Sequence, residues 1–238
     1  MDIATDWCDI NGDMCFSAPV SFLASGVLAT VGIAAQSHAK TPARKLIAIV
    51  PILFAVQQFI EGMQWLAEKP SVTSDVLTYG FLLFAFLLWP FYIPWAVLMN
   101  EHQPQRQKWM RVLTVLGLIL VVCLIFVLAT HPVHAVIYDS CIRYDINTSL
   151  SPFLLSWYVF VTVGSFALSS QHLIRWFGWF TAVSVFIAAV FYNWVFTSVW
   201  CFFAAVLSTL MYVYLRETGK AMSEKKYYVE NHRRKTDA

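Results

Sequence analysis

The chain alternates between long apolar stretches and short polar breaks along most of its length. A helix needs roughly 20 predominantly apolar residues to cross the hydrocarbon core of a bilayer. Seven stretches approach or reach that length, and they lie at about 17–37, 46–67, 76–99, 111–130, 152–170, 175–192 and 195–215. The pattern predicts an all-α, polytopic membrane protein with seven transmembrane helices.

Only a short polar-aromatic break, Tyr192-Asn193-Trp194, separates the sixth stretch from the seventh. A single helix from Trp176 to Leu215 would be about 60 Å long, roughly twice the thickness of the hydrocarbon core. We therefore expect two helices joined as a hairpin at this break.

The composition supports a membrane protein. Hydrophobic residues make up 59% of the chain and charged residues 13%, whereas about 25% of residues are charged in a soluble domain. The first 14 residues are acidic and lack the basic segment of a cleavable signal peptide. Because the basic residues lie in loops that flank the apolar stretches, the lipid bilayer is the expected partner and nucleic acid is not.

The positive charges predict an orientation. With seven spans, all of the 16 basic residues except Lys69 and Arg143 fall on one side of the membrane. They are Lys40, Arg44, Lys45, Arg106, Lys108, Arg111, Arg175, Arg216, Lys220, Lys225, Lys226, Arg233, Arg234 and Lys235. Cytoplasmic loops are rich in Lys and Arg, so the N-terminus is expected outside. The predicted regions are an extracytoplasmic segment (1–16), a seven-helix domain (17–215) and a charged cytoplasmic tail (216–238).

The second apolar stretch carries a polar stripe. Gln57, Glu61 and Gln64 are spaced i, i+4 and i+7 and share one face of a helix, with Gln58 and Trp65 beside them. Glu61 is the one acidic residue inside the seven stretches, and no basic residue lies in their interior. An intramembrane carboxylate usually faces a protein interior or a water-filled cavity. The stripe predicts a ligand, ion or proton site, with a structural hydrogen-bond clamp between helices as the alternative.

Other residues complete this candidate site. Most aromatic residues near the ends of spans form interfacial belts, but some are candidates for the walls of a cavity around Glu61. The candidate ligand-binding residues are Glu61, Gln57, Gln64, Trp65, Trp157, Trp200, Tyr192 and Asn193. In the third stretch, Pro90 and Pro94 remove helix hydrogen bonds and should kink or break the cytoplasmic half. That kink is a candidate gate.

The outer loop offers a second, alternative chemistry. Histidine, cysteine and aspartate are ligand types for zinc or copper, and the candidates are His131, His134, Asp139, Cys141 and Cys15. Their spacing matches no strong metal motif, so we predict no metal site. The competing interpretation is a disulfide between two of Cys8, Cys15 and Cys141.

Several absent motifs narrow the function. No lysine lies in a span, which excludes a retinal Schiff base, and the last span lacks the paired histidines of alkaline ceramidases and adiponectin receptors. No GxSxG motif or phosphate loop is present. The sequence favours a protein that is not an enzyme and specifies no cofactor.

Two short runs resemble a known family. Met14-Cys15-Phe16-Ser17 and the Glu61-Gly62 pair followed by Trp65 resemble an uncharacterised family of small bacterial membrane proteins. Chains of that family begin M-C-F-S and carry an E-G-x-x-W element in the second span. The resemblance continues at Ser198-Val199-Trp200-Cys201. It implies a bacterial inner-membrane location and a start at Met14, and it implies no activity.

The topology alone is similar to the seven-helix sugar transporters called SWEETs and their PQ-loop relatives. Those proteins have an outside N-terminus and a three-plus-one-plus-three arrangement, which is possible here because Thr30-Val31-Gly32 in the first span is matched by Thr162-Val163-Gly164 in the fifth. Their Pro-Gln motif is missing here.

The leading hypothesis is a membrane protein that binds or translocates a small molecule or ion through an outward-facing cavity centred on Glu61. One alternative is a metal-dependent hydrolase with the outer-face residues as ligands and Glu61 as general base. The other is a seven-helix signalling or assembly partner that acts through its basic tail. A homo-oligomer is compatible with each hypothesis.

Overall fold

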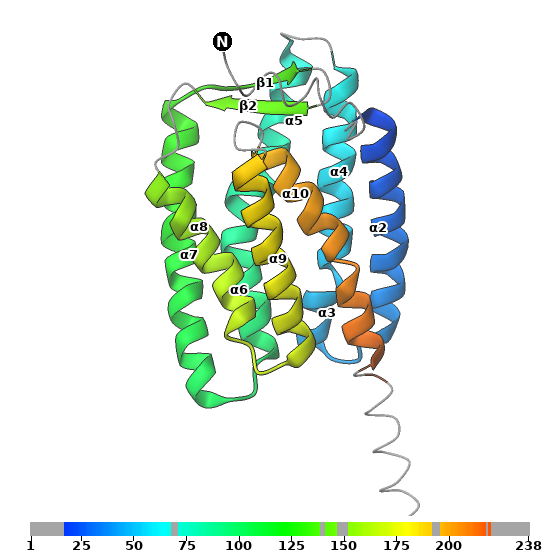
Figure 1. Ribbon diagram of the computed structural model, residues 1–238, viewed down its shortest axis with the longest axis vertical. Coiled ribbons are helices and arrows are strands. Elements are labelled where there is room, and N and C mark those ends of the chain that lie inside the picture. The colour runs from blue at the N-terminus through cyan, green and yellow to red at the C-terminus, as the bar shows by residue number, and fades with distance from the viewer. Residues whose placement is uncertain are drawn as a thin grey trace, which may run out of the picture.

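The computed structural model describes residues 17–67, 71–138, 141–146, 152–191, 196–217 and 219. Its elements, in chain order, are α2 (Ala18–His38), α3 (Pro42–Ala48), α4 (Val50–Leu66), α5 (Val72–Leu82), the π-helix η1 (Leu83–Leu88), α6 (Trp89–Asn100), α7 (Pro104–Thr130), β1 (Val133–Tyr138), β2 (Cys141–Ile146), α8 (Pro152–Ala167), α9 (His172–Phe191) and α10 (Phe196–Leu207) (Figure 1).

The helices reproduce the seven apolar stretches of the sequence. Six are long and apolar enough to cross a membrane: Ala18–His38, Pro42–Leu66, Val72–Asn100, Pro104–Thr130, His172–Phe191 and Phe196–Glu217. The seventh, α8, is apolar but has 16 residues. The expected pair of helices in place of one long helix is confirmed, because α9 and α10 are separate helices that pack against each other. Six apolar helices of this length indicate a multi-pass membrane protein.

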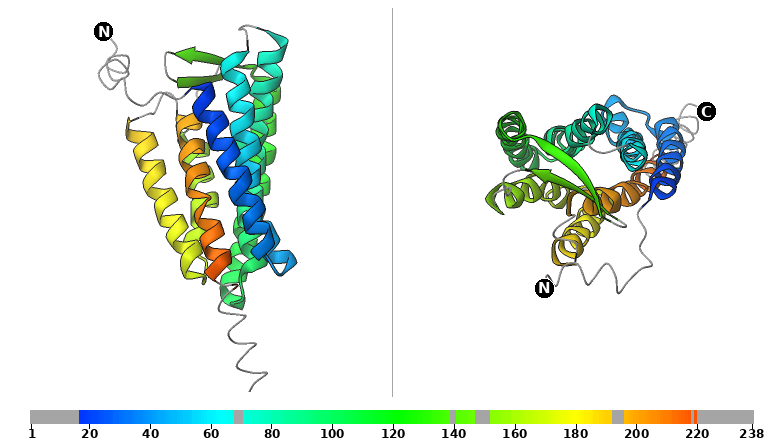
Figure 2. Two further views of the ribbon diagram at one scale, coloured as in Figure 1. Left: turned by 90° about the vertical axis from the view of Figure 1, so that its right-hand side faces the viewer. Right: turned by 90° about the horizontal axis from the view of Figure 1, so that it is seen from above.

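The bundle is a ring in which neighbours in sequence are mostly neighbours in space. α2 packs on α4, α6 on α7, α8 on α9, and α10 closes the ring against α2 and α4 (Figure 2). In addition, α6 contacts α8 across the ring. The three-plus-one-plus-three division of this ring stays a prediction.

The two ends of the bundle differ in charge. At one end lie the turns that join α2 to α3, α6 to α7 and α8 to α9, together with the last turns of the α10 segment (Figure 1). That end carries Lys40, Arg44, Lys45, Arg106, Lys108, Arg111, Arg175 and Arg216. We call it the basic end. The predicted segregation of the basic residues therefore holds within the described part of the chain.

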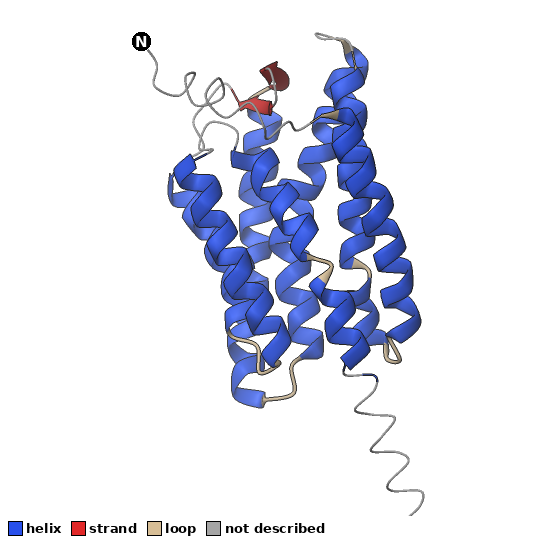
Figure 3. Ribbon diagram, turned by 45° about the vertical axis from the view of Figure 1, so that its right-hand side comes forward, coloured by secondary structure: helices blue, strands red, loops and turns tan. Residues whose placement is uncertain are grey.

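The other end is capped by a β-hairpin of two antiparallel strands, and we call it the hairpin end (Figure 3). The sequence predicted only a polar loop here. The pairing runs from Val133 opposite Ile146 to Tyr138 opposite Cys141. Val133, Ala135 and Ile142 are buried, so alternate positions of the strands face the bundle. This period-two burial is the normal signature of a half-buried strand.

The proline-containing span is one continuous helix, Val72–Asn100, but its hydrogen-bond register becomes π-helical before the first proline. In η1 the Trp89 N–H bonds the carbonyl of Phe84, five residues earlier. The next donor in this register would be Pro90, which has no N–H. The Tyr158 hydroxyl of α8 donates to the Ala85 carbonyl at 2.5 Å instead. The interrupted helix thus regains a hydrogen bond from a neighbouring helix, as a membrane interior requires.

A buried carboxylate ties the turns together at the basic end. Glu101 is 2% exposed. Its Oε1 accepts from the backbone N–H groups of His102 and Gln103 and from Ser170 Oγ, and its Oε2 accepts from the Ser170 N–H. Burial acts to raise the pKa of Glu101, but these hydrogen bonds outweigh it and hold the pKa below the ordinary value. Glu101 therefore links the α6–α7 turn to the α8–α9 turn as a charged group.

Candidate functional site

Glu61 lies inside the bundle, as the polar stripe predicts. It is 3% exposed, and the residue lies five positions, or about 8 Å, before the end of α4 at the hairpin end. Gln58 Nε2 donates to Glu61 Oε2 at 2.9 Å, and the Ser198 hydroxyl of α10 donates to Oε1. Among the described residues, no Lys, Arg or His forms an ion pair with this carboxyl. The group is thus held between α4 and α10 without a cation.

Two fully buried glutamines adjoin Glu61. Gln57 Oε1 accepts from the Trp89 indole N–H at 2.8 Å, which connects α4 to the start of α6. The other amide atom, Gln57 Nε2, is directed at the Cys201 thiol of α10, and Gln58 Oε1 has no hydrogen-bond partner in the described structure. We call Gln57, Gln58, Glu61 and Ser198 the Glu61 cluster. The cluster combines a buried carboxyl with an unused acceptor, Gln58 Oε1.

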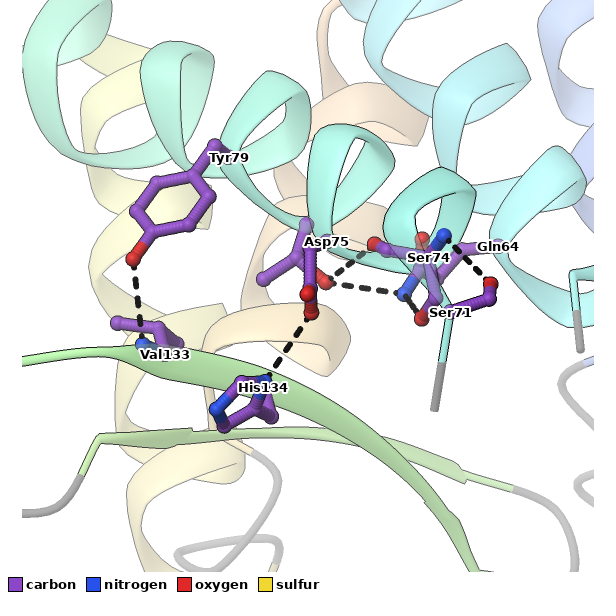
Figure 4. A network of polar contacts seen from close by, with 8 residues as sticks. Gln64, Ser71, Ser74, Asp75, Tyr79, Val133 and His134 are labelled. Atoms are coloured by element: carbon purple, nitrogen blue, oxygen red, sulfur yellow. Dashed lines mark hydrogen bonds and ion pairs between the residues drawn. The ribbon is translucent and has the colours of Figure 1, made fainter. Parts of the chain in front are cut away.

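Gln64, the third member of the predicted stripe, has different partners. Its Nε2 donates to Ser74 Oγ at 3.1 Å and to Thr78 Oγ1 at 3.0 Å, both on α5 (Figure 4). The face shared with Glu61 is therefore buried along its length, but its outer end is occupied by a contact between α4 and α5. Gln64 belongs to that contact and not to the Glu61 cluster.

A cavity lies next to the Glu61 cluster, further from the hairpin. It is small, with a volume of about 40 Å³. Its walls come from α4, α6, α8, α9 and α10 and include Phe54, Trp89, Tyr158, Trp200 and Cys201. Glu61 is not among the lining residues. The cavity therefore begins beside the cluster and is not centred on the carboxyl, in contrast to the arrangement that the sequence suggested.

The two tryptophans predicted as cavity walls lie in different places. Trp200 lines the cavity, and its indole nitrogen has no partner among the described residues. Trp157 is partly buried and packs edge-on against Phe153, with 5.8 Å between ring centroids, but it is not part of the cavity wall.

The remaining candidates of the ligand site are placed as follows. Trp65 is partly buried and its indole nitrogen is also without a partner in the described chain. Pro90 and Pro94 are buried in α6, and their role as a gate stays a prediction. Tyr192 and Asn193 lie outside the described residues.

The outer-face histidines do not meet. His131 Nδ1 lies 2.9 Å from Thr130 Oγ1, whereas His134 Nδ1 lies 3.1 Å from Asp75 Oδ1. Across the described ranges no three His, Cys, Asp or Glu side chains are grouped to hold a metal ion. Cys15 and Asp139 lie outside those ranges, and of Cys141 only the strand position is described. The hydrolase alternative gains no metal centre from the described part.

The hairpin is fastened over the site. His134 pairs with Asp75 of α5, and the Val133 N–H donates to the Tyr79 hydroxyl at 3.4 Å (Figure 4). From β2, Tyr144 stacks on Phe81 with ring centroids 4.5 Å apart, and its hydroxyl is buried without a partner in the described chain. Burial, followed by the nearby charge of Glu61, raises the pKa of Tyr144 well above its usual range. A protonated phenol therefore faces the Glu61 cluster from the hairpin.

The sequence did not reveal three of these neighbours. Ser198 is a single hydroxyl in an apolar span, Trp89 has the appearance of an interfacial residue, and Tyr144 lies in a segment expected to be a loop. The alternation Ile142-Arg143-Tyr144-Asp145-Ile146 was the available signal for β2, and β1 has no such alternation. No one-dimensional pattern links Ser198 to Glu61, because they are 137 residues apart.

The chain matches a family described as a family of unknown function, DUF6629, over residues 14–226. The chain belongs to DUF6629. The match starts at Met14 and includes every helix and strand described above. Membership in an uncharacterised family, expected from the sequence, is thereby confirmed. No curated protein and no solved structure matches the chain. Membership of DUF6629 supplies no activity, so the function has to be argued from the geometry.

Proposed function

We propose that this protein binds or translocates a small molecule or ion at the Glu61 cluster. The observation that supports the proposal is a buried carboxyl that has no cation partner among the described residues and is surrounded by buried polar atoms with unused hydrogen-bonding capacity. An ionisable residue at membrane depth is by default a functional candidate.

The unused atoms favour a binding site over a purely structural clamp. A clamp is stable when each buried donor and acceptor is satisfied, and each one left without a partner costs about 1–3 kcal/mol. In the Gln64 contact the amide nitrogen has two acceptors, and Gln64 Oε1 has no partner among the described residues. Nearer the carboxyl, Gln58 Oε1 has no partner in the described structure, and at the cavity the same is true of Trp200 Nε1. A bound ligand would satisfy them.

The proposal includes an orientation. Because basic residues gather at one end of the bundle, we assign that end to the cytoplasm. The hairpin then faces the outside of a bacterial inner membrane, a location that the sequence resemblance supports. A solute from the outside would reach Glu61 beside the hairpin, and Pro90 and Pro94 lie on the path toward the cytoplasm.

The test compares wild-type protein with Glu61→Gln in lipid nanodiscs. Thermal unfolding is measured with a panel of inorganic cations, organic cations, anions and sugars. A ligand at 100 times its Kd stabilises the folded state by about 2.7 kcal/mol, so a specific member of the panel should raise the wild-type Tm clearly. In Glu61→Gln the Tm without ligand should stay close to wild type, because an amide keeps the acceptor for Ser198, while the ligand-dependent shift should disappear.

The matched control is Glu217→Gln, which removes an exposed carboxylate at the basic end and should keep the full ligand-dependent shift. The proposal is wrong if no panel member stabilises the wild type, or if Glu61→Gln responds to ligand as strongly as the wild type does.

A further inference from the structure

The side chains that hold Glu61 can act both as hydrogen-bond donors and as acceptors. Gln58 Nε2 donates to Glu61 Oε2 at 2.9 Å, and the Ser198 hydroxyl donates to Oε1. A hydroxyl also has lone pairs that accept, and an amide has a carbonyl beside its NH₂ group. The carbonyl of Gln58 has no partner in the described structure. The same two side chains can therefore donate to an ionised carboxylate or, after rotation of the hydroxyl and the amide, accept the O–H of the protonated acid.

The surroundings of Glu61 leave room for a proton but not for a larger ion unless side chains move. Glu61 is 3% exposed, and both of its oxygens already accept hydrogen bonds. The nearby cavity has a volume of about 40 Å³, and none of Gln57, Gln58, Glu61 or Ser198 lines it. A metal cation needs several oxygen ligands around it, whereas a proton adds no volume. The carboxyl can change its protonation state within the present packing.

The titratable groups around Glu61 supply no positive charge to it. Tyr144 of β2 and Cys201 of α10 lie close enough for an electrostatic interaction with Glu61, and both are neutral when they hold their protons. Other titratable groups on the surrounding elements lie at the basic end (His38, Arg44, Lys45), contact the hairpin or its helix (Asp75, Tyr79) or pair with each other (Arg143, Asp145). A buried carboxyl without a cation avoids the cost of its charge by binding a proton.

Tyr144 lies between Glu61 and the hairpin end. Its ring stacks on Phe81 with 4.5 Å between centroids, and its hydroxyl is buried without a partner in the described chain. A phenol can accept one proton while it donates another. Toward the basic end, by contrast, the next space is the cavity, which is lined mainly by apolar and aromatic side chains such as Phe54 and Trp200. The hairpin end is therefore the favourable side for proton exchange.

We propose that Glu61 is a proton-binding site that exchanges its proton with the hairpin end through the hydroxyl of Tyr144. In uptake, Tyr144 passes its phenolic proton to the Glu61 carboxylate and takes a proton from a hydronium ion at the hairpin end, which becomes water. The phenol is thereby restored and Glu61 becomes neutral, and release is the reverse. This inference goes beyond the proposed function, because the proton occupies Glu61 whether or not another ligand binds.

The first experiment detects the proton by infrared difference spectroscopy of the full chain in nanodiscs. At about pH 6 exposed aspartate and glutamate side chains are almost fully ionised, so wild type minus Glu61→Gln should show the C=O stretch of one carboxylic acid. The same band should disappear from the wild type at alkaline pH, which provides a second measurement if Glu61→Gln does not fold. The matched control is Glu217→Gln at an exposed position, whose difference spectrum should lack the band.

Ser198→Ala tests the geometry of the site. The variant removes the hydroxyl that contacts Glu61 Oε1, so the acid loses one hydrogen-bond partner. The carboxylic acid band should remain at about pH 6 and move to a higher frequency, because hydrogen bonding lowers the frequency of a C=O stretch. An unmoved band would show that the protonated group is not the one beside Ser198, and it would overturn the inference.

The second experiment measures the route of exchange. Transfer of the nanodiscs to heavy water replaces the O–H of the acid by O–D and shifts the band, so its time course gives the exchange rate. Tyr144→Phe should slow the exchange by about tenfold or more, because the positioned hydroxyl that relays the proton is lost. Tyr79→Phe is the matched control, since its hydroxyl also contacts the hairpin, and it should not slow the exchange.

The outcomes separate this inference from the proposed function. Absence of the acid band would show that Glu61 is ionised, and equal exchange rates in wild type and Tyr144→Phe would exclude the route through Tyr144, so either result overturns the inference. A ligand that stabilises the wild type but not Glu61→Gln, in a protein without the band, leaves the proposed function standing. A band with slowed exchange in Tyr144→Phe, but no response to the ligand panel, supports the proton site and overturns the proposed function.

Discussion

At the residue scale, the span with two prolines shows how one missing N–H is compensated within a bundle. In the π-helical register the Trp89 N–H donates to the Phe84 carbonyl, and Pro90 has no N–H to donate to the Ala85 carbonyl. Tyr158 supplies the donor from α8, and its ring also forms part of the cavity wall. The same side chain therefore stabilises the irregular helix and shapes the candidate binding site.

Removal of the Tyr158 hydroxyl tests whether it compensates for the missing N–H of Pro90. Tyr158→Phe should lower the free energy of unfolding by about 1–3 kcal/mol, because it leaves a buried carbonyl without a donor. In a Pro90→Ala background the backbone gains an N–H, so the same substitution should have a smaller effect. Unfolding in detergent, followed by circular dichroism, gives the four stabilities of this double-mutant cycle. Equal losses in both backgrounds would show that Tyr158 does not compensate for Pro90.

At the scale of elements, α6 and α7 approach closely at a single glycine. A Cβ at Gly117 would lie 2.1 Å from the carbonyl oxygen of Pro90. That carbonyl lacks its usual donor, since Pro94 four residues later has no N–H. Small residues allow membrane helices to pack backbone against backbone, and Gly117 performs this role in a helix that otherwise exposes large apolar side chains such as Val122 and Phe126.

Gly117→Ala should therefore destabilise the protein by about 1–3 kcal/mol, the usual range for overpacking, as the two helices are forced apart. Gly26→Ala is the matched control, because a Cβ at Gly26 meets no atom within 4 Å. The control should keep or slightly raise the stability, since alanine favours helix more than glycine does. Thermal unfolding of both variants in detergent is the measurement, and equal Tm values for both would contradict the close-packing interpretation.

The turns at the basic end form a second contact between elements, and this contact depends on pH. The pKa of Glu101 in the folded protein lies below the ordinary value of 4.5. A lowered pKa means that ionised Glu101 stabilises the fold above 4.5, and that this stabilisation is lost as the pH falls through the lower folded value. The difference in Tm between wild type and Glu101→Gln should be largest near neutral pH and should shrink below 4.5. Asp145→Asn, which removes an exposed carboxylate on the hairpin, should show less of this trend.

At the scale of the whole molecule, the apolar pattern was sufficient to predict the number and approximate bounds of the helices. Helix length in a bilayer is limited by its thickness, so the breaks in the pattern identify the turns. The hairpin at residues 133–146 was missed because β1 does not alternate between apolar and polar residues, β2 alternates over only five residues, Ile142–Ile146, and the polar residues nearby suggest a loop.

The candidate site was predicted only in part, for a similar reason. Helical periodicity placed Gln57 and Glu61 on one buried face, which the structure confirms. Periodicity describes a single helix, however, and the partners Ser198 and Trp89 come from other helices. The spacing also gave Gln64 the same role as Glu61, whereas one further turn directs it to α5. The position of the cavity depends on five helices and has no counterpart in local sequence.

The proposed orientation can be tested with single cysteines introduced after the five native cysteines are replaced. Thr73→Cys is exposed at the hairpin end and Lys108→Cys is exposed at the basic end. A membrane-impermeant maleimide added to intact cells should label position 73 and not position 108. After the cells are permeabilised, both positions should react. Labelling of position 108 alone in intact cells would reverse the orientation.

The π-helix has a consequence for the relation between the two halves of its span. In a regular helix Thr78 and Trp89, eleven residues apart, would lie about 20° from each other on one face. The π-helix instead accommodates one additional residue in the turn between them. The outer half directs Thr78 toward Gln64, and the inner half directs Trp89 toward Gln57. Loss of one residue between Leu83 and Leu88 would restore a regular helix with the two halves in their present phase, so both contacts should survive the deletion.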